Sequence, residues 1–226
     1  PEHVGLSFGQ EYARVGVFMA QAGGQIVDGD EIVADSPENL EGLEYVKSLY
    51  DAGVLRFPAE IDAGWGGEAL GAGKAAMVIE GPWIKGIEGD FPDTNYASYE
   101  LPAGPGGPAT FSFTNCWGIP EGSPTADDAV SLVEFLTSDD QQVEFANAYG
   151  VLPSTEGAAA TYADSNPAIA GFVAGADYAV TPVAFDGAAA VTSEFNARLA
   201  DFATADFASI LADFQAQLEA AYADAQ

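Results

Sequence analysis

The sequence is poor in the residues that build several common kinds of site. It contains one cysteine, Cys116, and one histidine, His3, among 226 residues. A single cysteine excludes an intrachain disulfide and a cysteine-built metal site. A single histidine excludes a His-rich metal site and makes a Ser-His-Asp triad implausible. Cys116 stands in the apolar run FSFTNCWGI, which predicts a buried and inert thiol.

Positive charge is also scarce. Six Lys and Arg residues stand against 35 Asp and Glu residues, which gives a formal net charge of -29. Such a chain repels nucleic acid and anionic lipid headgroups, because binding to either requires a basic surface. The acidic residues are scattered and 48% of the sequence is hydrophobic, which predicts a folded protein. Two origins of the acidity stay open: a halophilic source, where salt screens the self-repulsion, or an acidic, Ala-rich protein from an ordinary high-GC organism.

No apolar run is long enough to cross a bilayer. The sequence begins at Pro1, without a starting Met or the apolar core of a signal peptide. We therefore expect a processed or truncated chain that has lost any N-terminal targeting or lipid-attachment segment.

Hydrophobic periodicity predicts many helices and few strands. Ser36 followed by Pro37 predicts the start of a helix that Gly53 ends. Extended structure is expected in QIVDGDEIV, as a hairpin, in AAMVI, as a buried strand, and in TFSFTNCWGIP. Helices are expected at 11–22, after Thr125, after Ser138, at 156–163, at about 167–175 and from about 186 to 223. This pattern indicates an α/β layering, with helices packed over a small sheet.

Three stretches occur in an order and at a spacing that together are specific. They are GKAAMVIEGPW at 73–83, NCWGIPEGSPTADDAVSLVEFLTSDDQQ at 115–142 and YGVLPST at 149–155. With them the sequence resembles the carbohydrate-type, maltose-binding-protein-like solute-binding proteins of ABC importers, from about Phe8 to the C-terminus.

The resemblance implies a periplasmic-binding-protein-like (type II) α/β fold, in which a ligand lies between two lobes. The chain would form mainly the C-terminal lobe, helix-rich around a small mixed sheet. Residues 1–108 would be the first part of this C-lobe, and residues 151–226 would supply its closing helices. Residues 109–150 would belong to the N-lobe, most of which is missing, so they would lack their partner sheet.

The resemblance also implies the function: capture of a small ligand, a mono- or oligosaccharide, and its delivery to the permease subunits of an ABC importer. It implies an extracytoplasmic, lipid-anchored monomer without a cofactor or catalysis. Two alternatives stay open. A carbohydrate-active enzyme on a related scaffold would need two opposed carboxylates in a cleft. An isolated lobe could instead act as an assembly module that binds no ligand.

Sugar sites pair aromatic rings with fixed carboxylates and amides. Trp83 follows the Gly-Pro that ends a predicted strand, and the resemblance makes it the expected stacking residue, although a core Trp is the plainer interpretation. Glu11 and Tyr12 match a ligand-binding pair, whereas a first-turn helix charge would equally explain Glu11.

The other candidates have equally plain alternatives. Asn115 could bind a hydroxyl, or could be an ordinary turn residue. Phe185 and Asp186 lie near the place where relatives have a further aromatic residue, although the alignment there is loose. Trp65 is a weaker candidate, and we expect it to pack on the surface of the lobe.

Overall fold

The computed structural model describes residues 3–225, so Pro1 lies outside the described residues. The chain forms two compact units. The first comprises the chain up to Glu80, Leu101–Ser112 and the stretch from Asp177 onward; the second comprises Gly81–Glu100 and Phe113–Ala176. The described helices include none that combines the length and the apolar character that crossing a bilayer requires.

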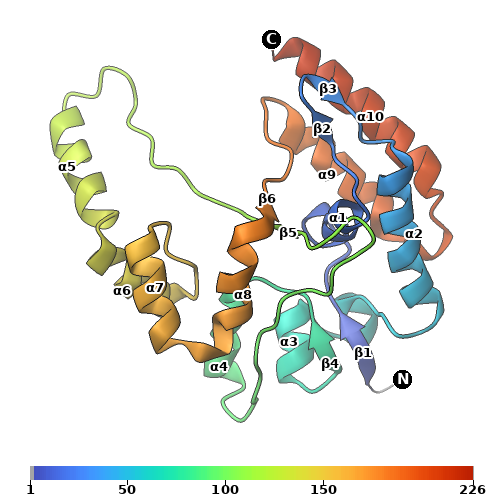
Figure 1. The fold of residues 1–226 in the computed structure, drawn as a ribbon, viewed down its shortest axis with the longest axis horizontal. Coiled ribbons are helices and arrows are strands. Elements are labelled where there is room, and N and C mark those ends of the chain that lie inside the picture. Colours follow the sequence, from blue (N-terminus) through green and yellow to red (C-terminus); the bar gives the residue numbers. More distant parts are fainter. Residues whose placement is uncertain (1–2, 226) are drawn as a thin grey trace. The chain divides into compact units, whose positions relative to one another are not determined.

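The first unit contains three two-stranded sheets and most of the core (Figure 1). Its strands are β1 (Val4–Ser7), β2 (Val27–Asp28), β3 (Glu31–Ile32), β4 (Ala75–Val78), β5 (Thr110–Phe111) and β6 (Ala179–Val180). Its α-helices are α1 (Tyr12–Gln21), α2 (Pro37–Asp51), α3 (Gly66–Gly71), α9 (Ala188–Arg198) and α10 (Phe207–Asp224). Two 3₁₀ segments, Pro58–Ile61 and Leu199–Thr204, connect them, and a third, Gly175–Tyr178, precedes β6.

Pairing in these sheets partly matches the expectation. The β2–β3 pair is antiparallel, with Val27 opposite Ile32, which confirms the predicted hairpin. The β1–β4 and β5–β6 pairs are parallel. The expectation of a buried strand at AAMVI is wrong for part of β4, because this strand is hydrogen-bonded to β1 alone and its Met77 is exposed.

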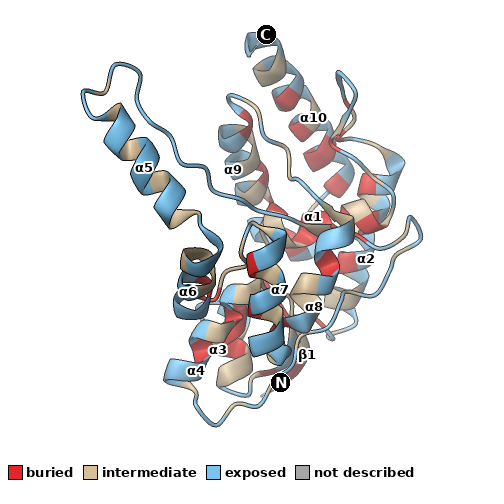
Figure 2. Ribbon diagram, turned by 60° about the vertical axis from the view of Figure 1, so that its left-hand side comes forward, coloured by how far each residue is buried: buried red, intermediate tan, exposed pale blue. Residues whose placement is uncertain are grey.

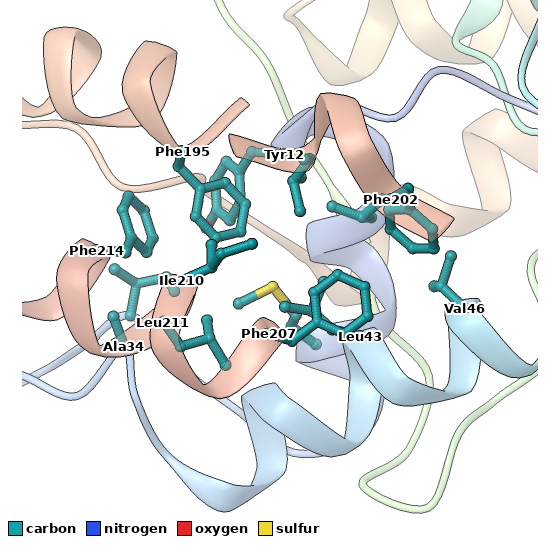
Figure 3. Packing of buried hydrophobic residues seen from close by; sticks show 14 of the residues in the cluster. Tyr12, Ala34, Leu43, Val46, Phe195, Phe202, Phe207, Ile210, Leu211 and Phe214 are labelled. Carbon is teal, nitrogen blue, oxygen red and sulfur yellow. The ribbon is translucent and has the colours of Figure 1, made fainter. Parts of the chain in front are cut away.

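The core of the first unit lies between α1, α2, α9 and α10 (Figure 3). Helix α2 begins as predicted: Ser36 Oγ accepts a hydrogen bond from the Asn39 N–H, and Pro37 is its first residue. The predicted core face of the C-terminal stretch is fully buried: Phe195, Leu199, Phe202, Phe207, Leu211, Phe214 and Leu218. The stretch is not one helix, since Asp201 is non-helical and Asp206 caps α10 by accepting from the Ser209 N–H.

The second unit is helical. It comprises α4 (Ile87–Asp90), α5 (Ala126–Leu136), α6 (Asp139–Tyr149), α7 (Glu156–Ser165), α8 (Ala170–Ala174) and the 3₁₀ segments Pro82–Gly86 and Pro167–Ile169. Its small core gathers around Tyr162, Ala146 and Ile169. Burial raises the pKa of the Tyr162 hydroxyl above its usual value.

Residues 113–136 differ from the sequence expectation. The strand expected in TFSFTNCWGIP is limited to β5, and residues 113–120 are exposed and without regular structure. The prediction of a buried thiol is therefore wrong, since Cys116 is exposed in this segment. Helix α5 is amphipathic but has no buried residue: Leu132 is 55% and Phe135 56% exposed (Figure 2).

Helices α1 and α2 approach so closely at Gly42 that only glycine fits. A Cβ atom there would lie 2.5 Å from both N and Cα of Met19. These are backbone atoms of the opposing helix, so they can move aside only if the helices separate. The contact therefore fixes how α1 lies on α2.

We predict that Gly42→Ala destabilises the protein by about 1–3 kcal/mol, because overpacking outweighs the gain of about 1 kcal/mol in helix propensity. Urea unfolding of the variant and the parent measures the difference. Gly89→Ala in α4 is the matched control, because a Cβ atom there meets nothing within 4 Å, and we expect no loss of stability. Equal unfolding midpoints for Gly42→Ala and the parent would contradict the assignment.

Candidate ligand-binding site

The first candidate residues lie at one edge of the β1–β4 sheet. The two strands are parallel, with Leu6 opposite Met77 and Ser7 opposite Val78. Their carboxyl ends therefore meet at the same edge, which is where ligands bind in many open α/β sheets. At this edge β1 leads into Glu11 and α1, and β4 leads into Ile79 and Glu80.

Arg14, in the first turn of α1, ties the two chain segments together at this edge. Its Nη2 lies 2.7 Å from Glu80 Oε2, and its Nε donates to the Ile79 carbonyl at 3.1 Å. The two side chains are 13% and 5% exposed, so this is a buried ion pair with additional hydrogen bonding. A buried charge is tolerated only when it is paired in this way.

Glu11 is the accessible acidic group of the edge. Its Oε1 lies 3.8 Å from Arg14 Nη1, while its side chain is 41% exposed. The carboxylate lies close over Gly9, where a Cβ atom would come within 2.0 Å of Glu11 Oε2. Glu11 is therefore placed between a small residue and a guanidinium, and it can still accept hydrogen bonds from a ligand.

Tyr12 lies in the core. It is 5% exposed, and its ring packs against Phe195 and Phe214 (Figure 3). Phe111 also contacts the ring. Burial raises the pKa of the Tyr12 hydroxyl well above its usual value, and a hydrogen bond with the backbone of Val183 partly offsets this effect. The structure thus gives Tyr12 a packing role, and its contact with a ligand stays a prediction.

The loop before α9 packs on the same core cluster as Tyr12 through Val183 and Phe185. Phe185, in this loop, is half-buried, and its ring meets that of Tyr222 edge-on at 5.1 Å. Asp186 is exposed beside it. A hydrogen bond also joins α1 to α9, since the Tyr12 N–H donates to Asn196 Oδ1 at 2.7 Å.

The other two candidates belong to the second unit. Trp83 lies in the 3₁₀ segment Pro82–Gly86, and its partly exposed ring covers Gly81, where a Cβ atom would come within 2.3 Å of the ring. Asn115 is exposed in the segment 113–120. The first unit thus contains Glu11, Tyr12, Phe185 and Asp186, and the second contains Trp83 and Asn115.

Sequence reasoning missed Arg14 and Glu80. The available signal was the scarcity of cations: one of only six Lys and Arg residues lies in the first turn of a predicted helix, next to a candidate carboxylate. Within residues 3–225, no three His, Cys, Asp or Glu side chains are grouped so that they could hold a metal ion.

Comparisons with known proteins agree with this architecture. Residues 5–171 match the family model described as bacterial extracellular solute-binding protein. A search of curated proteins gave no match.

Three similar solved structures are sugar-binding proteins. The cyclic alpha-maltosyl-1,6-maltose binding protein from Arthrobacter globiformis has a TM-score of 0.72 at 22% identity, over 98% of this chain and 60% of that one. An ABC substrate-binding protein from Listeria monocytogenes, in complex with cycloalternan, has a TM-score of 0.76 at 21% identity, over 99% and 58%. The maltose-bound MalE3 of T. maritima has a TM-score of 0.76 at 19% identity, over 96% and 60%.

The chain therefore spans about three-fifths of the length of these structures. The likeness confirms the periplasmic-binding-protein-like fold that the sequence motifs predict. Because the family model covers well over half of the residues, the chain belongs to the bacterial extracellular solute-binding proteins.

Proposed function

We propose that the protein is the extracytoplasmic solute-binding component of an ABC importer and that its ligand is a mono- or oligosaccharide. The observation that supports this most directly is the partly exposed Glu11, which lies 3.8 Å from Arg14 at the carboxyl edge of the β1–β4 sheet. In the first unit this carboxylate can accept hydrogen bonds from sugar hydroxyls. In the second unit the partly exposed ring of Trp83 offers an apolar face on which a sugar can stack.

A cation beside the carboxylate favours an ordered Glu11 side chain, so that ligand binding loses less conformational freedom. Arg14 cannot turn away from Glu11 without breaking its hydrogen bonds with the buried Glu80 and with the Ile79 carbonyl. The scarcity of Lys and Arg favours a neutral ligand, since few cations are available to pair with an anionic one. Each of the six Lys and Arg side chains already contacts a carboxylate, an amide, a carbonyl or a ring: Arg14, Lys47, Arg56, Lys74, Lys85 and Arg198.

In this proposal the protein acts without catalysis, as a monomer that is lipid-anchored outside the cytoplasm. The ligand would draw two lobes together by a hinge, and the permease subunits would recognise the closed form. The similar structures are named as binding proteins, which supports this assignment over a carbohydrate-active enzyme.

We further propose that residues 109–150 belong to the other lobe from Phe113 onward, since Leu101–Ser112 lie in the first unit. Most of the large apolar side chains that are exposed in the described chain lie in this segment: Phe113, Trp117, Ile119, Val130, Leu132, Phe135, Phe145 and Tyr149. Such a concentration of exposed apolar side chains in one segment is typical of a surface that another body covers. The matched part is about three-fifths of these relatives, and their remaining two-fifths leave room for such a body.

Sugar binding can be tested by thermal shift and calorimetry with maltose and a panel of other mono- to trisaccharides. A sugar at 100 times its Kd stabilises the protein by about 2.7 kcal/mol, which corresponds to a rise in Tm of about 5–10 °C. We expect Trp83→Ala to weaken binding at least tenfold and Trp83→Phe to preserve most of it.

Tyr99→Ala is the control for this experiment. Tyr99 is the most exposed aromatic residue of the same unit, and we expect its removal to leave the affinity unchanged. If no sugar of the panel raises the Tm or produces heat, the proposed ligand class is wrong.

The assignment of 109–150 predicts burial of α5 by another body. Hydrogen exchange of residues 126–136 in this chain should be at least tenfold faster than in the protein isolated from its source, since the additional lobe would cover Leu132 and Phe135. Equal exchange of α5 in the two preparations would contradict the assignment, and the exchange of α2, which lies in the core of the first unit, serves as the internal control.

A halophilic origin of the acidic surface predicts a strong salt dependence of stability. Raising NaCl from 0.1 to 2 M shortens the Debye length from about 10 Å to below about 3 Å and screens the repulsion among the acidic groups. We expect the Tm to rise by about 10 °C or more, equally in NaCl and KCl. A Tm that is independent of salt, or a gain in one salt alone, would favour the alternative of an ordinary acidic protein.

A further inference from the structure

The loop before α3 places a second tryptophan next to Gly66, which lies against Glu80 at the carboxyl edge of the β1–β4 sheet. Trp65 precedes the first residue of α3 with extended backbone dihedral angles and is 36% exposed. Its ring covers Gly67, where a Cβ atom would come within 2.1–2.4 Å of Cη2, Cζ2 and Cζ3 of the indole. Any residue larger than glycine at position 67 would therefore push the ring out of its place.

The lack of a side chain at Gly66 likewise leaves room for the buried carboxylate of Glu80. A Cβ atom at Gly66 would come within 2.5 Å of Glu80 Oε1. The adjacent residues Gly66 and Gly67 thus lie against Glu80 and the indole of Trp65, respectively. A glycine within a helix lowers helix stability by up to about 1 kcal/mol relative to alanine. The contacts of Gly66 with Glu80 and of Gly67 with Trp65 are therefore made at the expense of the stability of α3.

These contacts connect Trp65 with the ion pair already described. Glu80 holds Arg14, and Arg14 lies beside Glu11. Two independent observations therefore point to the carboxyl edge of the β1–β4 sheet. A partly exposed indole lies over Gly67, and an accessible carboxylate lies beside the Arg14–Glu80 ion pair. An apolar ring face combined with an oriented acceptor is what the C–H face and the hydroxyls of a pyranose require.

We propose that Trp65 is a ligand-binding residue: its indole stacks on a pyranose ring whose hydroxyl donates to Glu11. This subsite lies within the first unit and is distinct from the ring of Trp83 in the second. The inference rests on the proposed function, since it names the residues of the first unit that hold a sugar ring.

The three tryptophans of the protein make a direct test possible. Each gives one indole N–H signal in a ¹⁵N–¹H correlation spectrum, and single Trp→Phe variants assign them. We titrate the protein with maltose and with the other sugars of the panel. A saturable shift of the Trp65 signal, with the same midpoint as the calorimetric Kd, is the expected result.

The outcomes separate this inference from the proposed function. A sugar that binds and shifts the Trp83 signal while the Trp65 signal stays in place would overturn the role of Trp65 and leave the proposed function intact. If neither signal shifts and no heat is measured with any sugar, both proposals fail.

Affinities of variants add a second readout that a merely structural role of Trp65 would not change. We expect Trp65→Ala to weaken sugar binding about tenfold or more, and Trp65→Tyr to restore it to within about threefold, because a phenol ring also stacks. Tyr45→Ala, which removes an exposed aromatic residue of α2 in the same unit, is the matched control with unchanged affinity. Equal affinities of Trp65→Ala and the parent would overturn the proposal.

Discussion

The parallel pairing of β1 and β4 is the constraint on which the candidate site depends. These short strands are separated by most of the first third of the sequence, and their register places Ser7 and Val78 side by side at one end. The two segments that leave this end, toward α1 and toward Glu80, are then joined by Arg14. A buried ion pair adds little net stability, since desolvation offsets attraction, but it strongly disfavours arrangements that leave either charge unpaired. The pair therefore acts mainly by selecting one geometry for the edge.

Sequence patterns were most informative where one interaction dominates. The seven apolar residues from Phe195 to Leu218 are spaced for one helical face, and all are buried although the stretch breaks at Asp201. Ser36 and Pro37 mark the start of α2 because capping is a local effect. Three family motifs predicted the fold of the whole chain, which the family match and the structural neighbours confirm.

Features that depend on distant partners could not be predicted in this way. Strand β1 is four residues long and contains Gly5, so its own sequence gives almost no signal before β4 pairs with it. The stripe on α5 and the run around Cys116 look like core segments, because apolar composition does not reveal whether a partner surface is present. The contact of Arg14 with Glu80 spans 66 residues, and the motif that contains Glu80 does not reveal which residue it pairs with.

The close approach at Gly42 has a consequence for how the protein can respond to a ligand. With the backbone of Met19 lying directly on α2, any sliding or rolling of α1 at this contact would require the two helices to separate. Glu11 and Arg14 lie at the start of the same helix, so their backbone position depends on this contact. Adaptation to ligands of different size must then come from connecting segments, such as the loop that contains Phe185 and Asp186. Evolution toward a new ligand would be expected to alter the length and composition of those segments while it leaves α1 untouched.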